Sequence, residues 1–143
     1  MKRQLSLVLR DLAEPDAAPI DVRLVRARDA SGAFAIQPGH ADLVAALVPS
    51  LVEWVAVDGG THFTGVPGGV LRVSNGDAVE ILARRLYAGD TPGDVARALR
   101  RARDGERQAD EDRRRSLDRL EAEIAGHLVR RLTTAPKAEG TAP

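Results

Sequence analysis

Residues that could perform chemistry are few and scattered in this sequence. The three histidines, His40, His62 and His127, stand far apart, without HxxxH spacing and without any cysteine to complete a metal-binding set. No serine lies in a GxSxG turn of the kind that exposes the nucleophile of a hydrolase. We therefore expect no catalytic residue and no metal site.

Two glycine pairs resemble parts of a phosphate-binding loop. One is Gly59-Gly60, which follows Asp58, and the other is Gly68-Gly69, which follows Pro67. A phosphate-binding loop opens a helix, and the P-loop type also carries a lysine followed by serine or threonine. Strand-like segments follow both pairs here, so we interpret both as turns.

An arginine-rich stretch between residues 97 and 115 is the remaining candidate for a binding surface. Acidic residues are mixed into it, and over the whole chain 21 basic side chains balance 21 acidic ones. With 3% aromatic residues there is also no platform on which bases would stack. Such a mixture on a helix is typical of a solvated face with i,i+4 ion pairs, and contact with an acidic protein surface is the alternative. We expect no nucleic-acid partner.

The elements that carry these residues change in type near Tyr87. Up to about Leu86, short apolar runs alternate with turn signals, which is typical of a sandwich or barrel of β-strands. The strongest local signal is Asn75-Gly76 between two apolar runs, because both residues tolerate positive φ and so suit a tight hairpin turn. The strand-like runs are residues 4–9, 20–26, 34–36, 51–57, 70–73 and 79–82.

After Tyr87 the apolar residues are spaced as in a helix. Thr91 suits the N-cap, Pro92 the first helical position and Asp94 the first turn. A charged segment containing Gly105 then separates two apolar stripes, so we expect a helical hairpin with its turn near residues 104–112, and one long bent helix is the alternative. The stripes are Val95, Ala98, Leu99 and Ala102, and then Leu117, Leu120, Ile124, Leu128 and Leu132.

These patterns predict three parts: a β-sandwich domain at residues 1–88, a C-terminal α-helical hairpin at 89–134 and a disordered tail at 135–143. No apolar run approaches the roughly 20 residues that span a bilayer. The N-terminal apolar stretch is cut off at Arg10, before a signal-peptide core is reached. The absence of cysteine fits a reducing compartment. We expect no direct membrane insertion.

Two motifs, in order along the chain, resemble those of the epsilon subunits of F-type ATP synthases. Residues 32–43 read GAFAIQPGHADL, similar to the family pattern G-x-hydrophobic-G/A-I-x-P-G-H-x-x-hydrophobic, and they match Pro38-Gly39-His40 in full. The step Gly68-Gly69 and residues 70–83 look like a second family signature, G-G-hydrophobic-hydrophobic-x-V followed by hydrophobic-L-A. The order and spacing hold over residues 4–88. The lead-in at residues 26–34 and Trp54 resemble the alternate, sodium-translocating type.

The resemblance implies a β-sandwich of about ten strands at the foot of the central stalk, on the cytoplasmic face of the inner membrane. Carried over by position, the loop of Ser31, Gly32, Ala33 and Phe34 would face the ring of c subunits, and His40 would lie near the gamma subunit. Members of the family often have an acidic residue where this chain has Ala33, which puts a charged contact there in doubt.

The resemblance also implies that the C-terminal helices pack on the sandwich or extend along gamma and block ATP hydrolysis. The basic residues that would then approach the beta subunit are Arg113, Arg114, Arg115, Arg130 and Arg131. Some members bind ATP through an [I/L]-D-x-x-R-A motif. Asp94 and Arg97 are the matching candidates for nucleotide binding, but Gly93 replaces the hydrophobic residue and Asp94 is already explained as a helix-start residue. We expect no bound ATP.

Two other functions remain open alternatives. The chain could be a free-standing β-sandwich interaction module that dimerises through residues 117–132, or an isolated hydrolase that depends on His40. The sequence leaves open the coupling ion, whether the tail inhibits hydrolysis, and whether the tail is compact or extended at rest.

Overall fold

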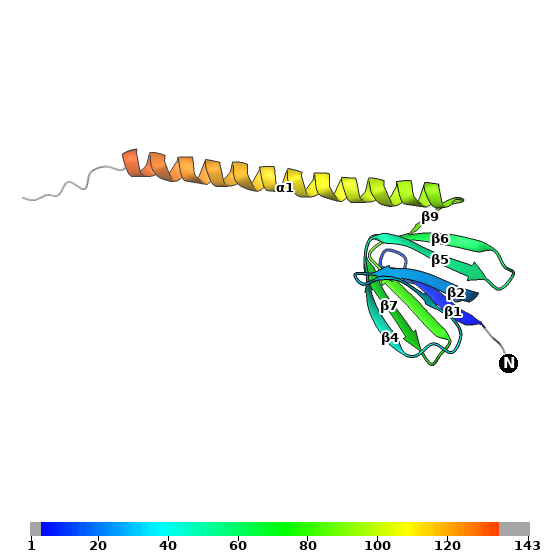
Figure 1. The fold of residues 1–143 in the computed structure, drawn as a ribbon. Coiled ribbons are helices and arrows are strands. Elements are labelled where there is room, and N and C mark those ends of the chain that lie inside the picture. The colour runs from blue at the N-terminus through cyan, green and yellow to red at the C-terminus, as the bar shows by residue number, and fades with distance from the viewer. Residues whose placement is uncertain (1–3, 135–143) are drawn as a thin grey trace, which may run out of the picture. The chain divides into compact units, whose positions relative to one another are not determined.

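The computed structural model describes residues 4–134, in which nine strands precede one helix (Figure 1). The sequence predicted about ten strands. The predicted disordered tail at residues 135–143 lies outside the described residues. The elements are β1 (Leu5–Asp11), β2 (Ile20–Asp29), β3 (Gly32–Ile36), β4 (Leu43–Leu47), β5 (Ser50–Ala56), β6 (Thr61–Val66), β7 (Gly69–Ser74), β8 (Ala78–Ala83), β9 (Tyr87–Ala88) and α1 (Pro92–Thr134).

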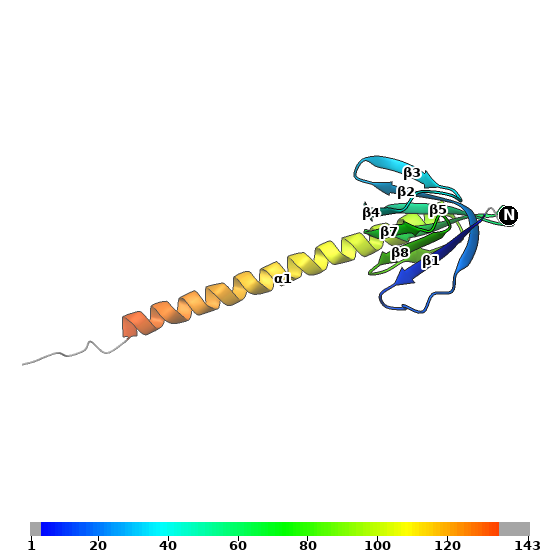
Figure 2. The ribbon, with the colours of Figure 1, turned by 90° about the horizontal axis from the view of Figure 1, so that it is seen from below.

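The strands form two packed layers (Figures 1 and 2). The first layer has the order β1-β8-β7-β4, and the second has the order β3-β2-β5-β6-β9. The layers join where β1 pairs with β2 and where Leu47 of β4 meets Asp29 of β2. All pairs are antiparallel except β1 with β8, which run parallel from Ser6 opposite Ala78 to Asp11 opposite Ala83.

The core between the layers is almost wholly aliphatic. The core arises from the alternation of apolar and polar residues along the strands, because alternate side chains of a strand point to the same face. Trp54 and Phe34 pack partly buried against it. The side chains that are at most 1% exposed are Leu5, Leu7, Val22, Val25, Ile36, Val52, Val66, Leu71, Val73, Val79 and Ile81 in the sandwich, together with Val95 of α1.

The predicted hairpin at Asn75-Gly76 is confirmed. It joins β7 to β8 through residues 75–77, of which Asn75 and Gly76 have φ angles of 57° and 75°. Asparagine and glycine tolerate positive φ better than other residues, so this pair suits the turn. Asp58-Gly59-Gly60 forms the β5–β6 turn, where Asp58 Oδ1 accepts a 2.8 Å hydrogen bond from the Gly60 N–H.

The predicted start of the helix is confirmed, but the predicted helical hairpin is wrong. α1 runs without interruption through residues 104–112, so the alternative of a single long helix describes the fold. A glycine such as Gly105 costs a helix only about 1 kcal/mol relative to alanine. The arginine, glutamate, glutamine and alanine residues around it are good helix formers. Ion pairs one turn apart, Asp110 with Arg113 and Asp112 with Arg115, add further support.

The chain forms two compact units, of which the first ends at Arg103 and the second begins at Asp104. The first turns of α1 therefore belong with the sandwich, while the predicted boundary at residue 88 stays a prediction. In the second unit the apolar stripe is more than half exposed at each position: Leu117 58%, Leu120 51%, Ile124 52%, Leu128 54% and Leu132 80%.

Candidate functional site

The β2–β3 turn and the start of β3 carry the four residues that were predicted to contact a partner ring. Asp29 shapes this turn, since its Oδ1 accepts hydrogen bonds from the Ser31 N–H at 2.8 Å and from the Ser31 hydroxyl at 2.6 Å. These bonds favour the carboxylate and lower the pKa of Asp29. Gly32 has a φ of 128°, which other residues rarely adopt.

The turn presents small, uncharged side chains to solvent. Ser31 and Ala33 are exposed, whereas Phe34 is half-buried and packs against the core. Phe34 therefore anchors the turn, and the accessible contact surface consists of Ser31, Gly32 and Ala33. Sequence reasoning missed Asp29, although an aspartate two residues before a serine is a recognisable turn signal.

The β3–β4 loop holds His40 in a defined orientation. The His40 N–H donates to the carbonyl of Gln37 at 3.1 Å and closes the Pro38-Gly39 turn, in which Gly39 has a φ of 88°. The ring Nδ1 lies 2.7 Å from the Ala41 carbonyl. A carbonyl only accepts, so Nδ1 carries the proton in this hydrogen bond and Nε2 is the atom left for a partner.

The β7–β8 turn fixes the His40 loop from the side. The Gly39 N–H donates to the Gly76 carbonyl at 2.7 Å, and the Asn75 N–H donates to Asp42 Oδ1 at 3.1 Å. A Cβ added at Gly76 would lie 3.5 Å from the Gly39 Cα. The loop and the turn thus form one rigid corner, and its members Asp42, Asn75 and Gly76 were not foreseen as site residues.

The structure does not bring the two predicted contact sites together. The Ser31 turn precedes β3 and the His40 loop follows it, so they lie at opposite ends of that strand. Each end carries its own set of backbone turns. The arrangement suits contact with two different partners.

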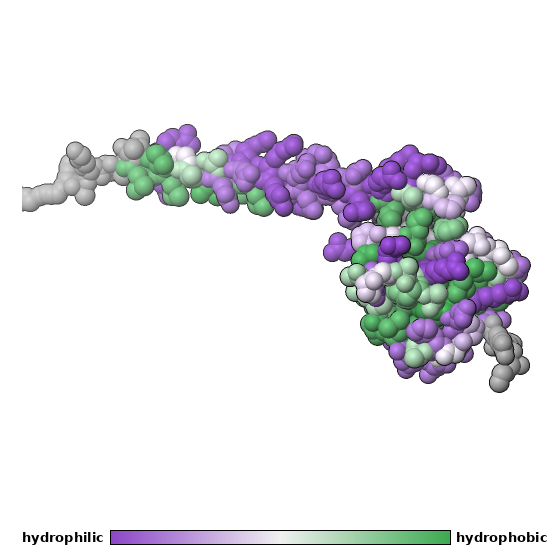
Figure 3. Space-filling model, in the orientation of Figure 1, coloured by the Kyte–Doolittle hydropathy of each residue, from purple (hydrophilic) through white to green (hydrophobic). Residues whose placement is uncertain are grey.

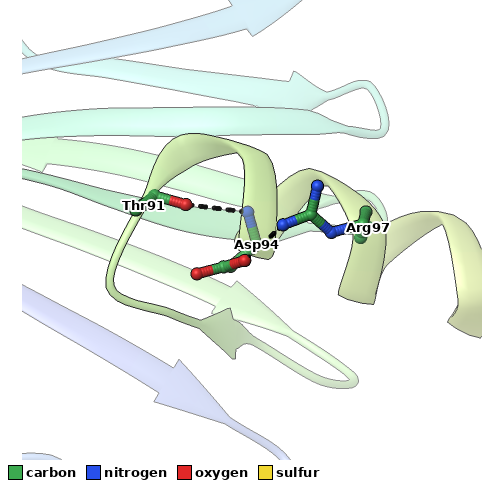
Figure 4. Close-up of polar contacts among 3 residues, drawn as sticks. All are labelled: Thr91, Asp94 and Arg97. Atoms are coloured by element: carbon green, nitrogen blue, oxygen red, sulfur yellow. Dashed lines mark hydrogen bonds and ion pairs between the residues drawn. The ribbon is translucent and has the colours of Figure 1, made fainter.

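The candidate nucleotide-binding residues lie at the start of α1 (Figure 4). Thr91 caps the helix, because its hydroxyl accepts a 3.1 Å hydrogen bond from the Asp94 N–H. The carboxylate of Asp94 pairs with the guanidinium of Arg97 one turn later, and this hydrogen bond holds the pKa of Asp94 below its ordinary value. Both side chains are exposed and bind each other rather than facing an open cavity.

A glycine in β6 makes room for the first turns of α1. A Cβ on Gly65 would lie 3.0 Å from Val95 Cγ1, 3.3 Å from Tyr87 Cβ and 3.5 Å from Leu99 Cβ. Val95 is fully buried and Leu99 is 7% exposed. The absence of a side chain at residue 65 is therefore what lets α1 pack on the outer face of the second layer.

The five arginines predicted to meet an acidic partner do not form one cluster. Arg113 pairs with Asp110, and Arg115 Nη1 lies 3.9 Å from Asp112 Oδ1, whereas Arg114 has no ion pair among the described residues. Consecutive helical residues point about 100° apart, so these three side chains face different directions. The other two, Arg130 and Arg131, follow four turns later near the end of α1.

Comparisons with known proteins agree with this fold. The family of the ATP synthase delta/epsilon chain β-sandwich domain matches residues 15–89. ATP synthase epsilon chain 2 of Cereibacter sphaeroides is 33% identical over 138 residues, which cover 94% of this chain and 94% of the relative. Epsilon chain 2 of Paraburkholderia xenovorans is 35% identical over 108 residues, or 76% of this chain and 78% of that one.

Solved structures share the fold at lower identity. A chain of the Euglena gracilis mitochondrial ATP synthase superposes with a TM-score of 0.58 at 23% identity, and the match covers 72% of this chain and 66% of that chain. A chain of the Tetrahymena thermophila mitochondrial ATP synthase has a TM-score of 0.51 at 18% identity, with 71% and 91% covered.

Together the fold and these matches define a non-catalytic β-sandwich subunit of a rotary ATP synthase. This chain belongs to the ATP synthase delta/epsilon chain family, and the resemblance to epsilon subunits is confirmed. Among the described residues, no helix has both the length and the apolar character needed to cross a membrane.

Proposed function

We propose that this chain couples the gamma subunit to the c-ring in the central stalk of an F-type ATP synthase. The observation that carries the proposal is the 33% identity to an epsilon chain over 94% of both proteins. The β2–β3 turn with the start of β3, at Ser31, Gly32, Ala33 and Phe34, contacts the c-ring, and the corner that holds His40 contacts gamma. The placement of these two sites at opposite ends of β3 supports a bridging role.

The coupling role is tested by binding and cross-linking. The purified chain is expected to bind gamma, and His40→Ala is expected to weaken this binding. His62→Ala is the matched control, because His62 is an exposed residue of strand β6 and not part of the His40 corner. In the assembled enzyme, Ser31→Cys is expected to cross-link to the c-ring. A chain that binds neither partner would refute the coupling role.

We further propose that α1 can inhibit ATP hydrolysis by bringing its arginines to an acidic segment of the beta subunit. Arg113 and Arg115 would exchange exposed i,i+3 pairs for this contact at little cost, because such pairs contribute less than about 1 kcal/mol. Deleting residues 104–143 leaves Val95 and Leu99 on the sandwich and is expected to raise ATPase activity. Unchanged activity would refute inhibition and leave coupling intact.

The membership in the family supports a proposal for the coupling ion and the location of the chain. We propose a peripheral position on the cytoplasmic face of the inner membrane and either protons or, as in the alternate type, sodium as the coupling ion. A requirement of the assembled enzyme for sodium would decide between the ions. We expect no ATP cofactor, since Asp94 and Arg97 already bind each other; saturable ATP binding that is lost in Arg97→Ala would refute this.

A second candidate function is a free-standing interaction module that dimerises through its helix. The exposed apolar stripe of α1, with Leu117, Leu120, Ile124 and Leu128 each more than half accessible, is the observation that favours it. Light scattering of the purified chain distinguishes this dimeric module from the stalk subunit. A tight dimer that dissociates in Leu120→Gln would favour the module over the stalk subunit.

A further inference from the structure

A residue of the β7–β8 turn has a chemical reactivity that the fold leaves open. Hydrophilic and hydrophobic residues are mixed on the visible face of the sandwich (Figure 3), so a distinct reactivity there comes from a single residue rather than from a patch. Asn75 is the only asparagine of the chain, and it is exposed. Asparagine is chemically labile in proteins. An asparagine that precedes a glycine is especially labile, because no Cβ obstructs the approach of the next backbone nitrogen to the side-chain amide.

Both reacting groups of the Asn75-Gly76 pair are unengaged in the structure. Among the described residues, neither the side-chain amide of Asn75 nor the Gly76 N–H takes part in a hydrogen bond. The bonds that the pair does make run from the Asn75 N–H to Asp42 Oδ1, at 3.1 Å, and from the Gly39 N–H to the Gly76 carbonyl, at 2.7 Å. The nitrogen and the amide carbon that would react are therefore both available.

Two aspartate-glycine pairs, at residues 58–59 and 104–105, provide a comparison within the same chain. Aspartate can form the same ring as asparagine, with loss of water in place of ammonia. The Gly59 N–H, however, donates a 2.9 Å hydrogen bond to the Ala56 carbonyl. Gly105 lies within α1, where backbone N–H groups are bound to the preceding turn. Attack by either nitrogen would break a backbone hydrogen bond, whereas attack in the β7–β8 turn breaks none.

We propose that Asn75 is a site of spontaneous deamidation and isomerisation in this chain. The backbone nitrogen of Gly76 bonds to Cγ of Asn75, the bond from Cγ to Nδ2 breaks, and the amide leaves as ammonia with the proton of that nitrogen. The product is a cyclic succinimide, which water opens without oxidation or reduction. Hydrolysis at Cγ gives aspartate. Hydrolysis at the backbone carbonyl gives isoaspartate, in which the main chain runs through Cβ and Cγ.

The isoaspartate form breaks the attachment of the His40 loop to this turn. It inserts one methylene, or about 1.5 Å of chain, between the two atoms that hold the loop. These atoms are the Asn75 nitrogen, bound to Asp42, and the Gly76 oxygen, bound to Gly39. The two hydrogen bonds cannot both keep their length and direction after the insertion. The inference goes beyond the proposed function and does not depend on it.

The experiment incubates the folded full chain for several days at mildly alkaline pH, which favours loss of the proton from the attacking nitrogen. An isoaspartyl methyltransferase with a labelled methyl donor measures isoaspartate, and peptide mapping by mass spectrometry locates it. Asn75→Gln is the matched control, because ring closure through the longer side chain is much slower. The same chain unfolded in urea is the reference for an unprotected Asn75-Gly76 pair. Anion exchange then isolates the isoaspartate form, which carries one more negative charge.

Wild type is expected to accumulate isoaspartate at residue 75 at a rate comparable with that of the unfolded chain, and Asn75→Gln is expected to accumulate none there. The isolated isoaspartate form should unfold at a lower urea concentration than Asn75→Asp, which adds the charge without the methylene. Its Gly39 amide should also exchange hydrogen faster. A folded chain that stays unmodified while the unfolded chain reacts would overturn the site. An isoaspartate form as stable as Asn75→Asp, with Gly39 equally protected, would overturn the loss of the attachment.

Discussion

The backbone N–H of Gly39 donates a 2.7 Å hydrogen bond to the carbonyl of Gly76, although the two residues belong to different hairpins. This bond and the one from Asn75 to Asp42 tie the loop that carries His40 to the β7–β8 turn. The orientation of His40 therefore depends on a turn that is distant in sequence. Substitutions in that turn should affect both the stability of the sandwich and the binding of gamma.

Gly76→Ala should destabilise the sandwich by about 1–2 kcal/mol, because Gly76 has a φ of 75° and an L-residue is strained there. Urea unfolding followed by Trp54 fluorescence measures the change. Gly105→Ala is the control, since Gly105 lies in α1 with nothing within 4 Å of an added Cβ. There alanine should increase helix stability by about 1 kcal/mol. A Gly76→Ala variant as stable as wild type would contradict the role of this turn.

Gly65→Leu should displace the first turns of α1 from the sandwich. An added Cβ already lies 3.0 Å from Val95 Cγ1, so a leucine side chain has no space. Hydrogen exchange of the amides at residues 95–102 should become faster because Val95 and Leu99 lose their packing partners. Ala33→Leu on the exposed side of β3 should leave this exchange unchanged. If these amides exchanged as slowly in Gly65→Leu as in wild type, the close packing at Gly65 would not be what holds the helix on the sandwich.

Thr64→Val should cost about 1–2 kcal/mol of unfolding free energy, although the side chains have similar shapes. Thr64 is 5% exposed, and its hydroxyl accepts a 3.1 Å hydrogen bond from Trp54 Nε1, which would lose its acceptor. Thr64→Ser retains the acceptor and should keep the fluorescence spectrum of Trp54, the only tryptophan of the chain. If the serine variant shifted the spectrum as far as the valine variant, the hydrogen bond would not be the cause.

The free energy of unfolding of the sandwich should decrease in acid because the stabilising contribution of the Asp11 carboxylate is lost there. Its Oδ2 accepts from the Leu86 N–H at 2.9 Å and its Oδ1 from the Ala13 N–H at 2.7 Å, and these bonds lower its pKa below the ordinary value. A lowered pKa in the folded state means that the contribution is complete above the unfolded pKa, near 3.9, and is lost as the pH falls through the folded value.

Asp11→Asn should therefore be less stable than wild type at pH 6, and the difference should narrow as the pH falls through the lowered folded-state pKa of Asp11, where the wild-type carboxyl becomes protonated too. Urea midpoints at several pH values measure this. Asp16→Asn, in the same connection between β1 and β2, is the control substitution. A constant difference between Asp11→Asn and wild type across this range would show that ionisation of Asp11 does not contribute.

Local chemistry explains why parts of the fold were predictable. Asn75-Gly76 favours a tight turn because both residues tolerate positive φ, and Thr91 with Pro92 specifies a helix start. Gly105 led to the wrong prediction of a turn near residues 104–112, because one glycine destabilises a helix only slightly and the neighbouring charged residues favour a helix. A strong local preference such as that of Asn75-Gly76 produced a turn, whereas the weak preference of Gly105 did not interrupt the helix.

Long-range contacts explain what the sequence left undetermined. His40 was identifiable from its motif, but its attachment through Gly39 to Gly76 depends on how two hairpins pack. Arg10, Arg72 and Glu80 are unremarkable as single positions in three strands, and only the pairing register makes them neighbours.

The parallel pairing of β1 with β8 also bears on how the protein is made. Among the described strands, β1 is synthesised before the others and pairs with β2 over part of its length only. Its more extensive pairing, with β8, can form only after six further strands have been made. Late, non-local pairing of this kind slows folding and leaves a strand edge open meanwhile. Synthesis that stalls before Ala83 would thus release a chain with β1 unpaired along most of its length, which makes prematurely terminated products prone to aggregate.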